Sequence, residues 1–173
     1  LDREERKYRR LTVDEIALLQ GFEADVVNLE GLTERERISV LGDAVPPAVA
    51  RALLRGISRE WTWHNRTAIE ICAGVGGLAE GAASAGLDHL LLIDASEICA
   101  RVLRNDRPWA EDRVVDGDVR THDFTRFAGR VGLLSGGPPC QPWSLGGHRQ
   151  GSADERDLLG TMPQLVDLLR PEV

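Results

Sequence analysis

Short apolar runs that alternate with helical stretches are the feature that most constrains the fold of this 173-residue chain. Each run ends in a turn or loop rich in glycine or acidic residues. Strands that alternate with helices predict an α/β fold with a mostly parallel sheet, because parallel neighbours need a crossover connection. The predicted strands are 68–72, 90–93, 114–115 and 131–134, and the predicted helices among them are 78–85, 96–104 and 155–169.

The residues ahead of the first strand have a different pattern and predict two helices. One is expected over 11–20, with Thr12 as its N-cap and Gly21 at its end. The second is expected over 48–57, directly after a pair of prolines that suits the first turn of a helix. Residues 58–66 are polar and aromatic and are interpreted as a linker.

Composition excludes several classes of protein. Hydrophobic residues make up 42% and charged residues 28%, which is ordinary for a globular domain. A formal charge of −7 argues against a protein that coats nucleic acid by bulk charge, although it leaves room for a local basic groove. No apolar run approaches the roughly 20 residues that a membrane span needs. The three cysteines form neither a disulfide framework nor a metal site, so we expect no metal and a reducing, cytoplasmic setting.

The turn after the first predicted strand, Gly74-Val75-Gly76-Gly77, is a candidate ligand loop. Glycines at this position allow a ligand to approach the backbone close to a helix N-terminus. The spacing differs from the G-x-G-x-x-G pattern, which disfavours a dinucleotide site. Taken alone, the loop is equally compatible with a plain tight turn.

Two aspartates follow the next strands. Asp94 ends the second apolar run, where a carboxylate can accept hydrogen bonds from ribose hydroxyls or can cap the following helix. Asp118 follows the third run and can accept from an adenine amino group or only close a turn. Ligands bind beyond the carboxyl ends of strands in such sheets, so both positions are candidates.

The loop after the fourth run carries the strongest signal. Cys140 lies in Gly136-Gly137-Pro138-Pro139-Cys140-Gln141-Pro142-Trp143-Ser144, where two prolines restrict the backbone. Cys72 and Cys99 lie in a strand and a helix, as structural cysteines do, whereas Cys140 lies where ligands bind in this architecture. We therefore interpret Cys140 as a nucleophile.

These loops together resemble the DNA (cytosine-5) methyltransferases. The sequence PCQ at 139–141 is similar to the catalytic loop of that family, and EICAGVGGL at 70–78 to its S-adenosylmethionine loop, with Glu70 for the usual Asp and Cys72 for the usual Phe. The segment 154–159 resembles the following motif. The resemblance implies a Rossmann-like S-adenosylmethionine-dependent methyltransferase fold, with the cofactor held by Cys72, Ala73, Gly74, Gly76, Gly77, Leu78, Asp94, Asp118, Val119, Pro138 and Leu159.

The N-terminal segment 1–57 resembles the last two motifs of the same family. Residues 9–22 are similar to the motif that supports DNA recognition, and 42–47 to the closing Gly-Asn-x-Val-x-Pro motif, with Asp43 for the usual Asn. Both motifs normally follow the catalytic loop. The resemblance therefore implies a circularly permuted and partial fold, in which residues 67–173 carry the cofactor and catalytic loops and the target-recognition domain is absent.

The resemblance implies methyl transfer from S-adenosyl-L-methionine to C5 of a flipped cytosine in DNA, leaving S-adenosyl-L-homocysteine. Cys140 would add covalently to C6, while Gln141 and Ser144 would face the nucleotide and its phosphates. The family's Glu-Asn-Val and Gln-x-Arg-x-Arg motifs are not found, so we expect the remainder of the enzyme in cis or on a second subunit. Two alternatives stay open: an RNA cytosine-5 methyltransferase, and a non-catalytic subunit that binds the cofactor or a partner.

Overall fold

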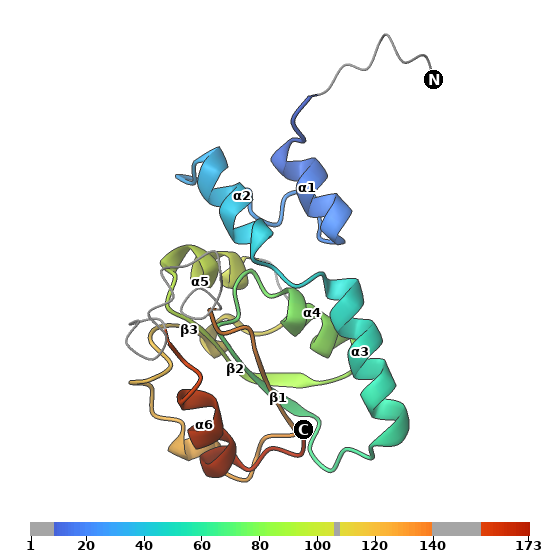
Figure 1. Ribbon diagram of the computed structural model, residues 1–173, viewed down its shortest axis with the longest axis vertical. Helices are drawn as coiled ribbons and strands as arrows, with labels where there is room; N and C mark the ends of the chain where they lie inside the picture. Colours follow the sequence, from blue (N-terminus) through green and yellow to red (C-terminus); the bar gives the residue numbers. More distant parts are fainter. Residues whose placement is uncertain (1–8, 106–107, 140–156) are drawn as a thin grey trace.

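A four-stranded, all-parallel sheet in the order β3-β2-β1-β4 forms the centre of the fold (Figure 1). The structure is a computed structural model that describes residues 9–105, 108–139 and 157–173. The α/β fold with a parallel sheet is confirmed, and it is the arrangement found in Rossmann-like methyltransferases. The elements are α1 (Val13–Gln20), α2 (Glu34–Gly42), α3 (Pro47–Glu60), β1 (Thr67–Ile71), α4 (Gly77–Ser84), β2 (Asp88–Asp94), α5 (Glu97–Arg104), η2 (Glu111–Arg113), β3 (Val114–Asp116), η3 (Thr125–Phe127), β4 (Leu133–Gly136) and α6 (Thr161–Leu169).

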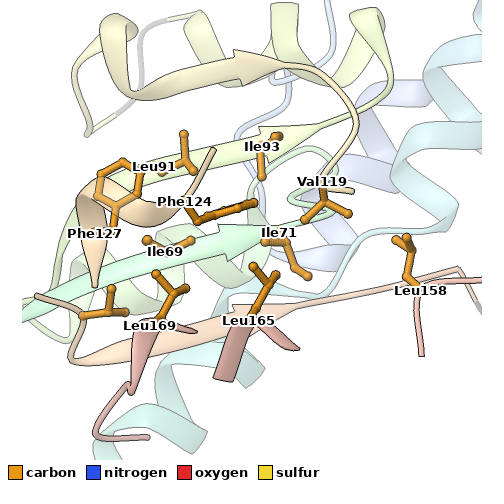
Figure 2. Packing of buried hydrophobic residues seen from close by; sticks show 11 residues of the cluster. Ile69, Ile71, Leu91, Ile93, Val119, Phe124, Phe127, Leu158, Leu165 and Leu169 are labelled. Carbon is orange, nitrogen blue, oxygen red and sulfur yellow. The ribbon is translucent and has the colours of Figure 1, made fainter. Parts of the chain in front are cut away.

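One face of the sheet is covered by α6 and the η3 region. Side chains alternate between the two faces of a strand, so every second residue of β1 and β2 points to this side. Figure 2 shows these side chains packed against those of the covering elements. The buried cluster contains Ile69, Ile71, Leu91, Ile93, Val119, Phe124, Phe127, Val131, Leu158, Leu165 and Leu169.

The opposite face is covered by α3, α4 and α5. Leu92 and Val114 pack against α5 through Ala100 and Leu103. Ala68 and Leu133 pack with residues of α3 and α4, including Leu54 and Ala82. Helices on both faces bury a parallel sheet, which explains why the sequences of its strands are nearly continuous apolar runs.

The helices α1 and α2 lie at the end of the sheet where the carboxyl ends of the strands meet (Figure 1). Each begins with a threonine N-cap and a glutamate three residues later, Thr12 with Glu15 and Thr33 with Glu36, and both capping boxes are formed. A buried cluster joins these helices to Val75 in the glycine turn and to α5: Ala17, Phe22, Val26, Val27, Leu41, Val75 and Val102.

The helices depart from the prediction in three main ways. The helix expected over 48–57 continues to Glu60, so three residues of the expected linker 58–66 are helical. The helix α2 was not predicted. The last helix begins at Thr161, not near residue 155; the proline at 163 is tolerated in a first turn but would clash in the interior of a longer helix.

A short segment at the end of the chain pairs with β4 and with the connection between α3 and β1. The N–H of Val173 donates to the carbonyl of Gly132, and its own carbonyl accepts from the N–H of Leu134, both at 3.0 Å. The Glu172 carboxylate accepts from the backbone N–H of His64 at 2.9 Å and of Asn65 at 2.6 Å. These bonds lower the pKa of Glu172 to about 2.

Among the described helices, none combines the length and apolar character that crossing a membrane requires.

The contact between α3 and α4 depends on a glycine. A Cβ added at Gly81 would lie 2.7 Å from the backbone nitrogen of Arg51 and closer still to the Cβ of Ala50. Replacing Gly81 by Ala should therefore lower the free energy of unfolding by about 1–3 kcal/mol through overpacking, as measured by urea denaturation. Gly56 is the matched control, because nothing lies within 4 Å of its added Cβ. Gly56→Ala should instead stabilise by about 0.5–1 kcal/mol, and equal effects of the two substitutions would contradict the packing argument.

Candidate functional site

A cavity of about 630 Å³ lies at the carboxyl edge of the sheet. Its size is that of a small-molecule or cofactor site, and its position is where open parallel sheets bind ligands. All four strands contribute to it through the loops that follow them. The described residues that line it are Glu36, Ser39, Val40, Asp43, Cys72, Gly74, Ile93, Asp94, Ala95, Ser96, Ile98, Cys99, Gly117, Asp118, Val119, Arg120, Gly137, Pro138, Pro139 and Leu158.

The Asp94 carboxylate fixes the glycine turn to the end of β2. One of its oxygens accepts from the N–H of Gly74 at 2.8 Å, and the other accepts from the N–H of Ser96 at 2.9 Å. Gly74 and Gly76 have φ of 55° and 82°, which glycine adopts at little cost. Gly76 is also the N-cap of α4, so the turn directs the positive end of this helix towards the carboxyl edge of the sheet.

Cys72 lines the cavity in a strained backbone conformation. Its φ of 50° is unusual for a residue other than glycine. Burial raises the pKa of its thiol to about 11, helped by the charges of Asp94, Asp118 and Glu70. The thiol is therefore held in its neutral form near pH 7. Cys72 was predicted to lie in the first strand, but β1 ends at Ile71 and Cys72 lies in the turn that follows it.

Cys99 also lines the cavity, from the first turn of α5. Burial raises the pKa of its thiol to about 11, with a smaller contribution from Asp94. The predicted position of Cys99 in a helix is confirmed, and this helix turn forms part of the cavity wall.

Asp118 is held by Arg120, two residues further along the chain. Its carboxylate accepts from the backbone N–H of Arg120 at 2.8 Å and from the Nε of the guanidinium at 3.0 Å on each oxygen. A third N–H group of Arg120 completes a two-pronged ion pair. These bonds lower the pKa of Asp118, so the carboxylate is ionised at the cavity wall.

Glu70 lies beneath the site in β1, paired in register with Leu92 of β2 and Ser135 of β4. It is only 2% exposed, and its Oε2 has no hydrogen-bond partner among the described residues. Burial, together with the charge of Asp94, raises the pKa of Glu70 well above the ordinary value. A neutral carboxyl therefore lies under the glycine turn that Asp94 anchors.

The structure brings together six of the predicted cofactor residues at the cavity wall: Cys72, Gly74, Asp94, Asp118, Val119 and Pro138. Ala73, Gly76, Gly77 and Leu78 belong to the same turn and to the start of α4 but are not among the lining residues. Leu159 is 55% exposed, and its neighbour Leu158 lines the cavity in its place.

The loop that carries the predicted nucleophile is outside the described residues. Cys140, Gln141 and Ser144 all belong to this part of the chain, as do residues 154–156 of the following motif. The described chain reaches Pro139, which lines the cavity together with Gly137 and Pro138. The loop thus leaves the sheet at the cavity wall.

The wall formed by α2 was missed. Glu36, Ser39, Val40 and Asp43 face the cavity from the N-terminal segment, opposite the sheet. The spacing of Thr33 and Glu36 is typical of a helix start and could have been used to predict α2. Arg120 was missed as well, although it lies two residues after a predicted site residue.

Comparison with known proteins places the chain in a family. The family described as C-5 cytosine-specific DNA methylase matches residues 2–59 and 66–173, nearly the whole chain. The chain belongs to this family, and the predicted resemblance to the DNA (cytosine-5) methyltransferases is thereby confirmed.

Its relatives include several named enzymes. The Type II methyltransferase M.NgoMIV of Neisseria gonorrhoeae is 44% identical over 105 residues, which are 60% of this chain and 31% of the relative. M.PspPI of Psychrobacter sp. (strain TA137) is 38% identical over 61% of this chain and 25% of its own length. M.Eco47II of Escherichia coli is 42% identical over 54% of this chain and 22% of its own length. The match therefore spans between a fifth and a third of these relatives.

The raised pKa values predict slow alkylation of both cavity cysteines. In variants that retain only Cys72 or only Cys99, the rate of modification by iodoacetamide should be low at pH 7. It should still be rising above pH 9, because thiolate forms only as the pH approaches about 11. An exposed model thiol, which has a pKa of about 8.5 and levels off near pH 10, is the comparison. A rate for either cysteine that levels off there would contradict the assignment.

Proposed function

We propose that this chain forms the cofactor-binding and nucleophile-bearing part of an enzyme that transfers a methyl group from S-adenosylmethionine to C5 of cytosine in DNA. The observation that carries the proposal is the convergence of Gly74, Asp94 and Asp118 on one cavity from three consecutive strand ends. Family membership supplies the reaction class. We also propose that it acts in the cytoplasm, as its sparse cysteines predict.

The residues at the cavity fit the cofactor by their hydrogen-bonding capacity. Each oxygen of Asp94 accepts one backbone N–H and retains a lone pair that could accept from a ribose hydroxyl. Asp118 is ionised and could accept from the amino group of adenine. The α4 N-terminus and the glycine turn would receive the methionine end, because the backbone can be approached closely there. When bound, the cofactor supplies an electrophilic methyl group.

Cys140 would supply the nucleophile. Addition of its thiolate to C6 of cytosine moves an electron pair to C5, which then carries the nucleophilic character that the free base lacks. After C5 has been methylated, loss of the C5 proton and of the Cys140 sulfur restores the aromatic ring. The target base must leave the duplex for this, since neither C5 nor C6 can be reached by a thiolate inside the stack.

The order of the motifs supports a circular permutation within this proposal. The family matches two separate segments, and the break between them, residues 60–65, coincides with the end of α3 and the connection to β1. The α3 helix packs closely against α4. A circular permutation costs little stability when the two original termini that it joins lie side by side, and the packing of α3 is compatible with this. The remaining parts of the enzyme, including the target-recognition domain, would come in cis or from a second subunit.

Cofactor binding tests the proposal directly. Calorimetry with S-adenosylhomocysteine should show binding by the wild-type chain and a loss of about 1–3 kcal/mol in Asp94→Ala, because a ribose partner and the anchor of the glycine turn are both removed. Asp88→Ala is the matched control, since it lies at the opposite end of the same strand. Equal losses in the two variants, or no binding by the wild type, would count against the site.

The nucleophile can be trapped in the complete enzyme. A DNA duplex with 5-fluorocytosine at the target should form a covalent adduct, because fluorine cannot leave C5 as a proton does. Cys140→Ser should abolish the adduct, since a hydroxyl is far less ionised than a thiol near neutral pH. Cys99→Ser controls for loss of a cysteine as such. Peptide mapping that placed the adduct on Cys72 or Cys99 would end the assignment.

A further inference from the structure

The ion pair between Asp118 and Arg120 does more than join two neighbouring residues. The Arg120 side chain is 47% exposed and that of Asp118 is 34% exposed, yet both line the cavity. An exposed ion pair contributes little to stability. We therefore ask what the arrangement of Arg120 and Asp118 does for a ligand in the cavity. The fork geometry of a guanidinium fixes the plane of the carboxylate that it binds.

The hydrogen bonds at Asp118 leave room for one more donor. A carboxylate has about four acceptor positions. The structure places three N–H groups of Arg120 on them in four contacts, two on each oxygen: the backbone N–H on Oδ1, the Nε–H shared between both oxygens, and one terminal N–H on Oδ2. When the shared Nε–H bonds to one oxygen alone, the other oxygen can accept an N–H group from a ligand while all three N–H groups of Arg120 stay bonded, whereas a carbonyl oxygen has nothing at this carboxylate to bond.

We propose that Arg120 is a positioning residue that holds Asp118 as a fixed, acceptor-only group and thereby makes the cavity select a purine with an amino group over one with a carbonyl at the same place. This inference rests on the proposed function, because it assumes that Asp118 faces the base of the cofactor. It adds a residue to the site and assigns that residue to discrimination between ligands.

The physical basis is the asymmetry between a matched and an unmatched polar group. An exocyclic amine donates to the ionised carboxylate, while a carbonyl in its place sets two acceptors against each other and finds no donor at Asp118. A carboxylate that could turn freely or take up a proton would lose this selectivity. Arg120 prevents both, because its fork fixes the orientation and its side-chain and backbone hydrogen bonds lower the pKa of Asp118.

The test compares two ligands whose bases differ at this position and in the proton on the neighbouring ring nitrogen. S-adenosylhomocysteine carries the amino group, and S-inosylhomocysteine carries a carbonyl there. Calorimetry with the wild-type chain should give a dissociation constant at least about tenfold lower for the adenosyl ligand. In Arg120→Ala this ratio should fall below about threefold, mainly by weaker binding of the adenosyl ligand. Arg120→Lys keeps the charge but not the fork, and should restore the ratio only in part.

Two controls separate selectivity from stability. Arg126→Ala removes an arginine of the same segment that stacks on Phe127 and is not among the lining residues, so it should leave the ratio unchanged. Asp118→Asn can present either an oxygen or an amide N–H, and should lower the ratio as Arg120→Ala does. Thermal melting identifies any variant that is misfolded, and the ratio measured in Arg120→Lys then decides the question.

Three outcomes overturn the inference. An unchanged ratio in Arg120→Ala would show that Arg120 has no part in discrimination. Tighter binding of both ligands by Arg120→Ala would show that the arginine occludes the cavity. Absence of binding by the wild-type chain would contradict the proposed function itself and the inference with it, which distinguishes that failure from the other two.

Discussion

Both oxygens of the Asp94 carboxylate accept backbone N–H groups, one from Gly74 and one from Ser96, and the shape of the cavity depends on these two bonds. They join the turn after β1 to the turn after β2, so the loops of two neighbouring strands form one surface. The nearby Glu70 is buried, and burial together with the charge of Asp94 raises its pKa. The Asp94 carboxylate thus shapes the cavity and keeps its remaining lone pairs for a ligand.

Much of the fold could be predicted because the strands of a parallel sheet are buried on both faces. Their apolar runs contrast with the glycine-rich and acidic loops that end them, so all four strands were found close to their true positions. The helix α2 could not be found in this way, because its sequence from Glu34 to Gly42 is mostly polar and has little apolar periodicity. Only its capping box identifies it. The late start of α6 depends on one proline at 163, a local steric effect that periodicity does not reveal.

The sequence predicted which residues form the candidate site but not the hydrogen bonds that those residues make. Strand ends identify Asp94 and Asp118, because ligand loops follow strands in this architecture. The hydrogen-bond partners of these carboxylates depend on loop geometry, so the ion pair between Arg120 and Asp118 could not be predicted. It is also hard to predict which of two adjacent residues faces a site: Leu158 lines the cavity, whereas Leu159 is exposed. Neither residue lies in a helix or strand, so no periodicity indicates which side chain points inward. The wall contributed by α2 required tertiary packing to become visible.

The close contact between α3 and α4 has a consequence for the integrity of the chain. The two segments matched by the family are covalently joined only through the connection between α3 and β1, where Glu172 accepts hydrogen bonds from His64 and Asn65. They are also joined without covalent bonds, by the packing at Gly81 and by the buried cluster around Val75. Proteolytic cleavage in this connection would therefore yield two fragments that remain associated, because the contacts that hold the N-terminal helices to the sheet lie elsewhere.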